Sequence, residues 1–170
     1  ILAAGVIDIV GNANGGTVPL LGVLMGVEYV DSSSKKTVFK NFWPGANNVS
    51  VDTNFPVKAF VADNPNQLFM IAADGSSTDK ATAQTNVFAN APMATATSGS
   101  TSTGRSTAEL DISGVATTAT LPLRVVGLTG DVANLDYDAA GVNYVVRLNF
   151  HHNAPCSSSD SQTTAASTGI

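Results

Sequence analysis

The residues best suited to bind a metal or to act in catalysis are two adjacent histidines and the single cysteine, His151, His152 and Cys156. Both histidines lie at the end of a predicted strand, so their side chains should point to opposite faces, and one metal ion does not easily bind both. A zinc site needs further ligands, and Cys156 is the only soft one nearby. The sequence indicates a Cys–His nucleophile pair equally weakly, because nothing around Cys156 would activate the thiol. We expect a solvated strand end here, with no metal site.

The acidic residues offer no catalytic pair. Glycoside hydrolysis needs two carboxyl groups on facing strands around a cleft lined with aromatic side chains. Glu28, Glu109 and Asp111 lie within predicted strands, where we expect them on an exposed polar face beside arginines. Most others fall in turns, where Asp caps its own backbone, and their spacing lacks the EF-hand pattern of calcium ligands. These turn residues are Asp31, Asp63, Asp74, Asp79, Asp131, Asp136 and Asp138.

The glycine-rich stretch 11–16 is not a phosphate site either. It joins two predicted strands, so it lacks the helix N-terminus that allows such loops to bind phosphate, and we predict a hairpin loop. The sequence therefore predicts that the protein is not an enzyme, with no catalytic residue, no cofactor and no bound metal.

The composition indicates one soluble domain of β type. A chain of 170 residues can bury a single core, and 44% hydrophobic with 12% charged residues excludes a wholly disordered chain. The formal net charge of −5 argues against nucleic-acid binding, which needs clustered Lys and Arg. The longest apolar stretch, Val18–Val27, is interrupted by Pro19, Gly22 and Gly26, so we expect no membrane span.

Strand-like runs recur about every dozen residues, and no segment keeps a helical apolar period over three turns. This rhythm predicts an all-β fold, an antiparallel β-sandwich or barrel of jelly-roll-like type, with little helix. Asp74-Gly75 is the best hairpin signal. A short helical turn is expected within Asp131–Ala140, with Asp131 as its N-cap. The predicted strands are Leu2–Val10, Val18–Tyr29, Lys36–Trp43, Val57–Ala62, Gln67–Ala73, Ala83–Ala89, Ser106–Ile112, Thr120–Gly127 and Val142–Phe150.

We expect a single β domain at residues 1–156, followed by a Ser/Thr-rich C-terminal tail at 157–170 without a strand pattern. Within the domain, the stretch 93–107 has almost no large apolar residue, so it cannot pack as core and predicts an exposed loop. The chain starts at Ile1 inside an apolar run, which suggests that the numbering begins partway through a longer product.

Phe39, Phe42 and Trp43 form the most concentrated apolar feature. One interpretation is a strand buried on both sides, or a strand end folded under the core. The other is a contact with a subunit or a partner, because Trp and Phe are favoured anchors of interfaces. These three residues are our candidates for an intermolecular contact.

Several phrases of the sequence together are similar to one known class of proteins. They resemble the small virion proteins of tailed bacteriophages that decorate or cement the head. The resemblance covers most of residues 21–152, in the same order, and contains no catalytic signature. The phrases are LGVLMGVEYVD at 21–31, KNFWPG at 40–45, VKAFVADNPNQLFMIAADG at 57–75, TLPLRVVGL at 120–128 and NYVVRLNFHH at 143–152.

The resemblance implies a non-enzymatic protein that stabilises the capsid from its outer face, at junctions between subunits. Its partners would be the phage major capsid protein and further copies of itself, as a dimer or trimer. It would be made in the cytoplasm of the bacterial host. The acidic balance suits the outside of the shell, because packed DNA would repel it on the inside. Phe39, Phe42 and Trp43 are then candidate contacts with a subunit or with the capsid.

Two alternatives stay open. The chain could be another virion structural protein, a shell or tail component, although the absence of a long predicted helix is untypical of tailed-phage shell subunits. It could also be a β-sandwich adhesin module that binds glycans. Such a module needs aromatic platforms for sugars, and only 6% of the residues are aromatic.

Overall fold

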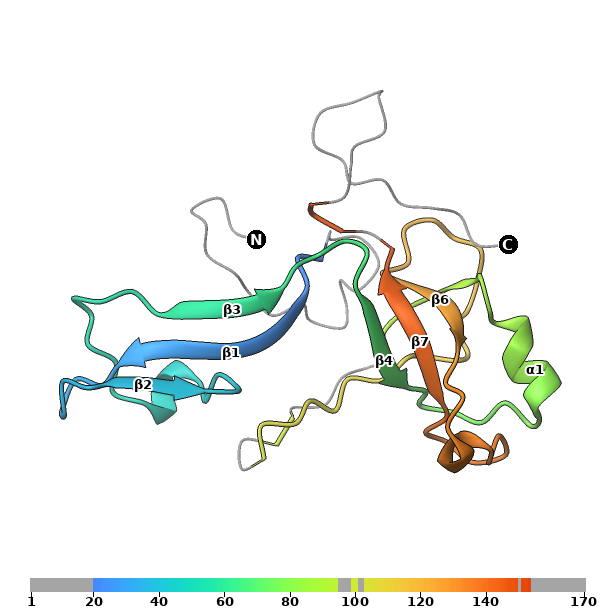
Figure 1. Cartoon of the computed structure of the whole chain (residues 1–170), viewed down its shortest axis with the longest axis horizontal. Coiled ribbons are helices and arrows are strands. Elements are labelled where there is room, and N and C mark those ends of the chain that lie inside the picture. Colours follow the sequence, from blue (N-terminus) through green and yellow to red (C-terminus); the bar gives the residue numbers. More distant parts are fainter. Residues whose placement is uncertain (1–19, 95–98, 101–102, 150, 154–170) are drawn as a thin grey trace, which may run out of the picture.

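The computed structural model describes residues 20–94, 99–100, 103–149 and 151–153, which build two antiparallel β-sheets and one short α-helix (Figure 1). In the three-stranded sheet, β1 (Val23–Val30) lies between β2 (Thr37–Lys40) and β3 (Lys58–Ala62). The four-stranded sheet has the order β4-β7-β6-β5. Its strands are β4 (Leu68–Ala72), β5 (Asn90–Ala91), β6 (Leu123–Leu128) and β7 (Asn143–Leu148).

The predicted fold class is confirmed, because both sheets are antiparallel and helix is scarce in the described residues. Neither sheet closes into a barrel. The three-stranded sheet extends to one side of the four-stranded sheet, and α1 (Lys80–Thr85) lies on the other side (Figure 1). No helix in the described ranges is long and apolar enough to cross a membrane. We refer to residues 23–62, which contain β1, β2 and β3, as the arm.

β7 carries the hydrophobic core, as the alternation in the sequence predicts. Tyr144, Val146 and Leu148 are buried, whereas the intervening residues are partly exposed. β7 pairs with β4 on one side and with β6 on the other, so it is an inner strand of the sheet. Residues of both neighbouring strands therefore flank its buried face. The other buried members of this core are Leu20, Ala73, Ala83, Ala91, Leu110, Leu123, Val125, Tyr137 and Val142.

The segment Ser106–Ile112, predicted as a strand, makes isolated bridges instead. The backbone N–H of Leu110 donates to the carbonyl of Ala72 at 2.8 Å, and its own carbonyl accepts from the N–H of Asp74 at 3.0 Å. Leu110 also bridges Met93, and its side chain is fully buried in the core. The segment therefore reaches the core through one buried residue, Leu110, and adds no strand to the sheet.

The strand predicted at Ala83–Ala89 is wrong, because the chain forms α1 over Lys80–Thr85. The carboxylate of Asp79 accepts a hydrogen bond from the N–H of Thr82 at 2.7 Å, which caps the helix at its start. Only Ala83 of this helix is buried, and its small side chain packs on the core. The helix is too short to show an apolar period in the sequence.

Two other turns bear on the predictions. Asp74-Gly75 does not close a hairpin, because β4, which precedes it, pairs with β7. The Asp74 carboxylate instead accepts from the N–H of Ile112, far along the chain, at 3.1 Å. The helical turn predicted near Asp131 is present as a 3₁₀ turn at Val132–Asn134, where the Asp131 carboxylate accepts from the N–H of Ala133 at 2.9 Å. Local capping was therefore readable from the sequence, whereas the long-range use of Asp74 was not.

Several predicted features lie wholly or partly outside the described residues. The strand at Leu2–Val10, Cys156 and the tail at 157–170 are among those left undescribed. Of the stretch 93–107, Met93 packs against the core, and the N–H of Ser100 donates to the carbonyl of Arg105 at 2.9 Å. Residues 103–107 are mostly exposed.

We expect Leu110→Ala to lower the free energy of unfolding by about 2–4 kcal/mol, because it removes a fully buried side chain and leaves a cavity beside β4. Leu68→Ala is the matched control, because Leu68 lies on β4 but is half exposed, and it should cost less than about 1 kcal/mol. Urea unfolding followed by circular dichroism measures both. Equal losses in the two variants would contradict the placement of Leu110 in the core.

Candidate functional site

One face of the arm presents two aromatic rings to solvent. Phe60 is directly opposite Gly26 in the sheet, and Phe39 is opposite Glu28, two residues further along β1 and on the same face. The two rings are tilted against each other with centroids 5.8 Å apart, and the two residues are 64% (Phe39) and 44% (Phe60) exposed. Side chains directly across a sheet lie on the same face. We define the aromatic face as Phe39, Phe60 and the bare backbone of Gly26 between them.

Gly26 is what allows the aromatic face to form. A Cβ atom at this position would lie 2.8 Å from Cζ of Phe39 and 2.9 Å from the carbonyl oxygen of Lys40. The ring of Phe39 therefore occupies the space that a side chain of β1 would otherwise fill. Glycine in the middle of a strand is unfavourable by itself, and here it is compensated by the ring that covers it.

An ion pair borders the aromatic face. Nζ of Lys58 is 2.9 Å from Oε1 of Glu28, and the two residues are direct partners across β1 and β3. Both side chains are solvent-accessible, so the pair contributes little to folding stability. It does give the face a polar rim with both signs of charge, which is the usual arrangement around the apolar centre of an interface.

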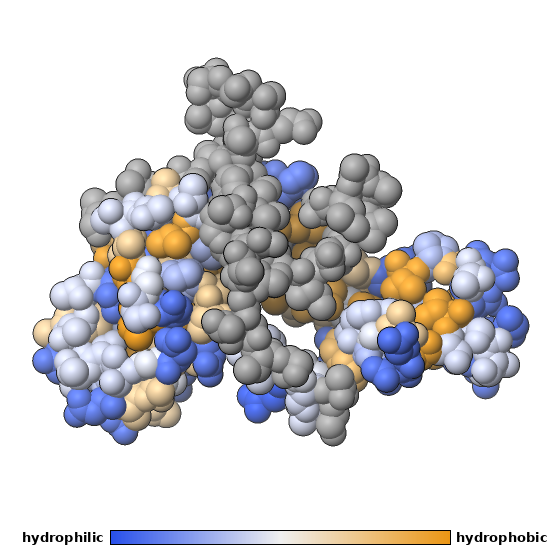
Figure 2. Space-filling view, turned by 180° about the vertical axis from the view of Figure 1, so that it is seen from behind, coloured by the Kyte–Doolittle hydropathy of each residue, from blue (hydrophilic) through white to orange (hydrophobic). Residues whose placement is uncertain are grey.

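Further apolar side chains are exposed along the arm. Figure 2 shows hydrophobic residues at the surface of the three-stranded sheet, at the right of that view. A scattered exposed leucine is ordinary, but a group of large apolar side chains on one small sheet indicates a surface made for contact. The other exposed large apolar residues of the arm are Val23, Leu24, Met25, Phe55 and Val57.

The opposite face of the arm is covered by the chain itself. Val27 and Tyr29 are buried there, and Trp43 packs edge-to-face on Tyr29 with ring centroids 6.0 Å apart. Asp52 closes this side, because its backbone N–H donates to Val30 and its carboxylate accepts from Lys35 at 2.9 Å. The hydrogen bond from Lys35 is the main reason that the pKa of Asp52 lies below its usual value.

The structure thus separates the three predicted contact residues. Phe39 lies on the aromatic face, whereas Trp43 is partly buried against Tyr29. Phe42 is also partly buried: Nζ of Lys40 lies 5.7 Å from its ring centroid, and the backbone of Gly104 lies against it. β2 ends at Lys40, so the alternation that relates Phe39 to its followers stops before Phe42 is reached.

Sequence reasoning missed Phe60. The strand that contains it was predicted, and an alternating pattern assigns it a face, but nothing in the sequence says which strand lies beside it or in which register. A glycine inside a strand, as at Gly26, is the one signal of a close approach by another group.

His151 is buried, contrary to the solvated strand end that was expected, because it forms a bridge with Leu20, which leads into β1. Its Nδ1 accepts from the N–H of Asn153 at 2.9 Å, and its Nε2 has no hydrogen-bond partner in the described part of the chain. Burial lowers the pKa of His151, opposed by the charge of Asp63. His152 is exposed.

A metal site at the histidines finds no support in the described ranges, where no three His, Cys, Asp or Glu side chains come together. The carboxylates are instead used by turns. Those of Asp31, Asp79 and Asp111 each accept one or more backbone N–H groups within three residues. Hydrogen bonds from Ser34 and from Thr82 lower the pKa of Asp31 and of Asp79, respectively.

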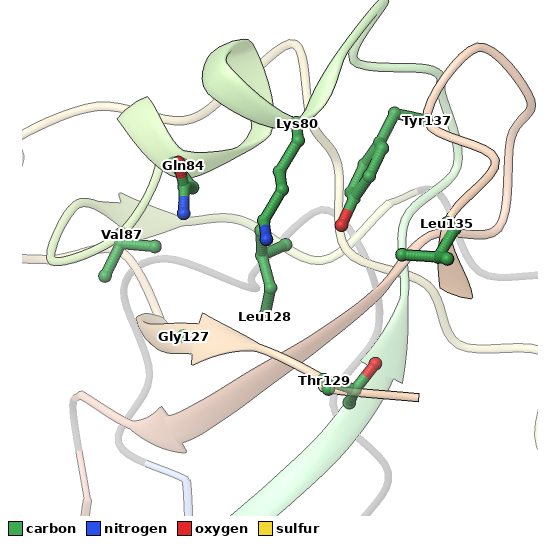
Figure 3. Close-up of a pocket in the computed structure, with 9 residues that line it drawn as sticks. Lys80, Gln84, Val87, Gly127, Leu128, Thr129, Leu135 and Tyr137 are labelled. Atoms are coloured by element: carbon green, nitrogen blue, oxygen red, sulfur yellow. The ribbon is translucent and has the colours of Figure 1, made fainter. Parts of the chain in front are cut away.

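A hollow of about 370 Å³ lies between α1, β6 and the segment around Tyr137 (Figure 3). Lys80 is its charged lining residue, and Tyr137 contributes a phenol. No sequence pattern pointed to this site, because its walls come from three separate segments. The remaining lining residues are Gln84, Val87, Gly127, Leu128, Thr129, Gly130 and Leu135.

No protein-family profile, no curated protein and no solved structure matches this chain. Function is therefore argued from the residues of the chain itself.

We expect the stability of the protein to fall as pH drops below about 6.5, because the unfolded state protonates His151 more readily than the folded state does. The loss starts near the unfolded pKa and ends below the folded one, with a slope of at most about 1.4 kcal/mol per pH unit for one proton. Urea unfolding at pH 7.5 and pH 5.5 measures it, and His151→Phe should reduce the difference between the two conditions.

His152→Gln is the comparison variant for this titration, because the exposed His152 contributes less than burial does to the low pKa of His151, so its replacement should change the pH dependence less than His151→Phe does. A nuclear magnetic resonance titration adds a direct readout. An imidazole of His151 that titrates at or above the ordinary histidine value would contradict its burial in neutral form.

Proposed function

We propose that the protein is a non-enzymatic structural protein that decorates the outer face of a bacteriophage head and stabilises the shell at subunit junctions. The aromatic face of the arm is the observation that carries this proposal. It is the surface through which the protein binds the major capsid protein.

The chemistry of the aromatic face suits an interface. Phe39 and Phe60 are held side by side by the sheet, so little side-chain freedom remains to be lost on binding. The ion pair of Glu28 and Lys58 at the rim offers both signs of charge for orientation. On the reverse face Val27 and Tyr29 are buried, with Trp43 packed on Tyr29, whereas Phe39 and Phe60 stay exposed to a partner.

The segments that resemble head-decoration proteins contain strands of both sheets. The phrase at 21–31 contains β1, and the phrase at 57–75 contains β3 and β4. The phrases at 120–128 and 143–152 contain β6 and β7. The similarity therefore follows the framework of the fold, which supports a shared structural role.

The use of the carboxylates supports a role without catalysis. Aspartates whose oxygens accept backbone N–H groups are held in the ionised form, and a lowered pKa makes them poor general acids at neutral pH. The formal net charge of −5 also favours the outside of a DNA-filled shell.

Stabilisation of a shell follows from simple thermodynamics. A protein that binds the closed shell but not its separated pieces shifts the equilibrium toward the closed shell by mass action. When one copy touches two capsid subunits, the second contact is effectively intramolecular, so even a modest interface suffices. Each junction then opens only when its own contacts and the bridging copy are lost together.

We expect Phe39→Ser/Phe60→Ser to weaken binding to heads that lack the protein by about tenfold or more, because it removes both aromatic anchors of the interface. Both side chains are largely exposed, so the variant should still fold. Co-sedimentation with the heads measures binding, and release of DNA on heating measures stabilisation.

Val132→Ser is the matched control, because Val132 is 81% exposed but lies on the 3₁₀ turn of the other sheet. It should bind heads as the wild type does. Undiminished binding by the double variant, or binding of the wild type only to tails or to glycans, would overturn the proposal. Association of purified copies that the double variant abolishes, without any head binding, would assign the face to a second copy instead.

A further inference from the structure

The hollow beside α1 has the features of a small binding site, separate from the arm. Figure 3 shows the side chains of Lys80 and Tyr137 converging on it from two different segments. Lys80 is the first residue of α1, and Tyr137 follows the 3₁₀ turn after β6. Its floor is formed by the end of β6 at Gly127 and Leu128.

Tyr137 is positioned with an unused polar group. The residue is only 9% exposed, and its backbone is fixed because its carbonyl accepts from the N–H of Ser77 at 2.8 Å. Its hydroxyl makes no hydrogen bond to any described residue, and it points into the hollow (Figure 3). The hydroxyl is accessible to solvent in the hollow, so it can exchange water for a ligand there.

Lys80 supplies the charge of the site. Its ammonium group forms no ion pair with a described carboxylate, and no acidic residue lines the hollow. The neighbouring Asp79 is committed to the N–H of Thr82, and Asp131 to the N–H of Ala133. The ammonium group can therefore donate to an anion in the hollow without displacing an existing partner.

The other walls carry apolar side chains together with the amide of Gln84 and the hydroxyl of Thr129. Val87, Leu128 and Leu135 give the hollow its hydrophobic lining. A Cβ atom at Gly127 or at Gly130 would meet nothing within 4 Å, so open space lies beside both glycines. The site thus combines one cation and a few polar groups, from Tyr137, Thr129 and Gln84, with an apolar wall, which is the usual composition of a small-molecule site.

We infer that this hollow binds a carboxylate carried on a short aliphatic group. The carboxylate accepts hydrogen bonds from Nζ of Lys80 and the hydroxyl of Tyr137, and the aliphatic group lies against Leu128 and Val87. A single cation balances a single negative charge. A phosphate group would need more donors, such as an arginine fork or a cluster of backbone N–H groups, and the lining has neither.

The test is a titration of the ¹⁵N-labelled full chain with 4-methylpentanoate, followed by nuclear magnetic resonance. We expect saturable shifts of the Gly127 and Gly130 amides with a dissociation constant on the order of millimolar. The neutral analogue 4-methylpentanamide should bind about fivefold more weakly or worse, because it carries no charge for Lys80. Absence of saturable shifts, or equal binding of acid and amide, would overturn the inference.

Variants assign the binding to the two polar groups. Lys80→Gln and Tyr137→Phe should each weaken binding about fivefold, and Tyr137→Phe keeps the buried ring that the core needs. Gly127→Val should block the hollow without a clash. Lys36→Gln is the control, because Lys36 is an exposed lysine in the arm, and it should bind as the wild type does. Equal affinity of Lys80→Gln and the wild type would place the ligand elsewhere.

The carboxylate could come from a free acid or from the C-terminal end of a protein chain. An acetylated peptide ending in Val-Leu with a free carboxyl group, compared with its amidated form, distinguishes these sources. Tighter binding of the free-acid peptide than of 4-methylpentanoate assigns the site to a chain end. Weaker binding of that peptide assigns it to a small carboxylic acid, and both results support a carboxylate site.

Discussion

The pairing of β7 on both of its edges is the interaction on which the rest of the structure depends. β7 joins β4 to β6, and its buried side chains belong to the same core as buried residues of β6 and α1. The hydroxyl of Tyr144 extends this role, since it lies within hydrogen-bond distance of Ser77 and of Asn86, which flank α1. With so few large apolar residues available, one central strand organises the core, α1 and the hollow beside it.

Most buried apolar residues gather around β7, so few are left to cover the arm. Its own buried residues, Val27 and Tyr29, are covered by Trp43 and the chain that follows, and this cover reaches one face only. In the described part of the chain, no second layer covers the face that holds Phe39 and Phe60. Three strands with a hydrophobic face can be stable by themselves, so the arm does not need a cover on this face to fold. The two rings therefore stay exposed.

Sequence reasoning succeeded where the information is local. The alternation in β7 and the capping role of Asp131 follow from neighbouring residues, and both are present in the structure. It failed at Ala83–Ala89, where one cap at Asp79 outweighs a strand-like composition. The burial of His151 and the approach of Phe60 to Phe39 depend on which segments meet in space. Neither a bridge partner nor a register can be read from a single sequence.

The junction between the arm and the four-stranded sheet links these features. The arm connects to the rest through the residues before β1 and after β3, and both connections are tied to the segment that follows β7. The N–H of His152 donates to the carbonyl of Leu20 at 2.7 Å, and the side chain of Asn153 donates to Asp63 at 3.4 Å. These two contacts tie both ends of the arm to the segment that follows β7. His151 lies buried beside them and burial lowers its pKa, so protonation of this histidine would place a charge inside the junction.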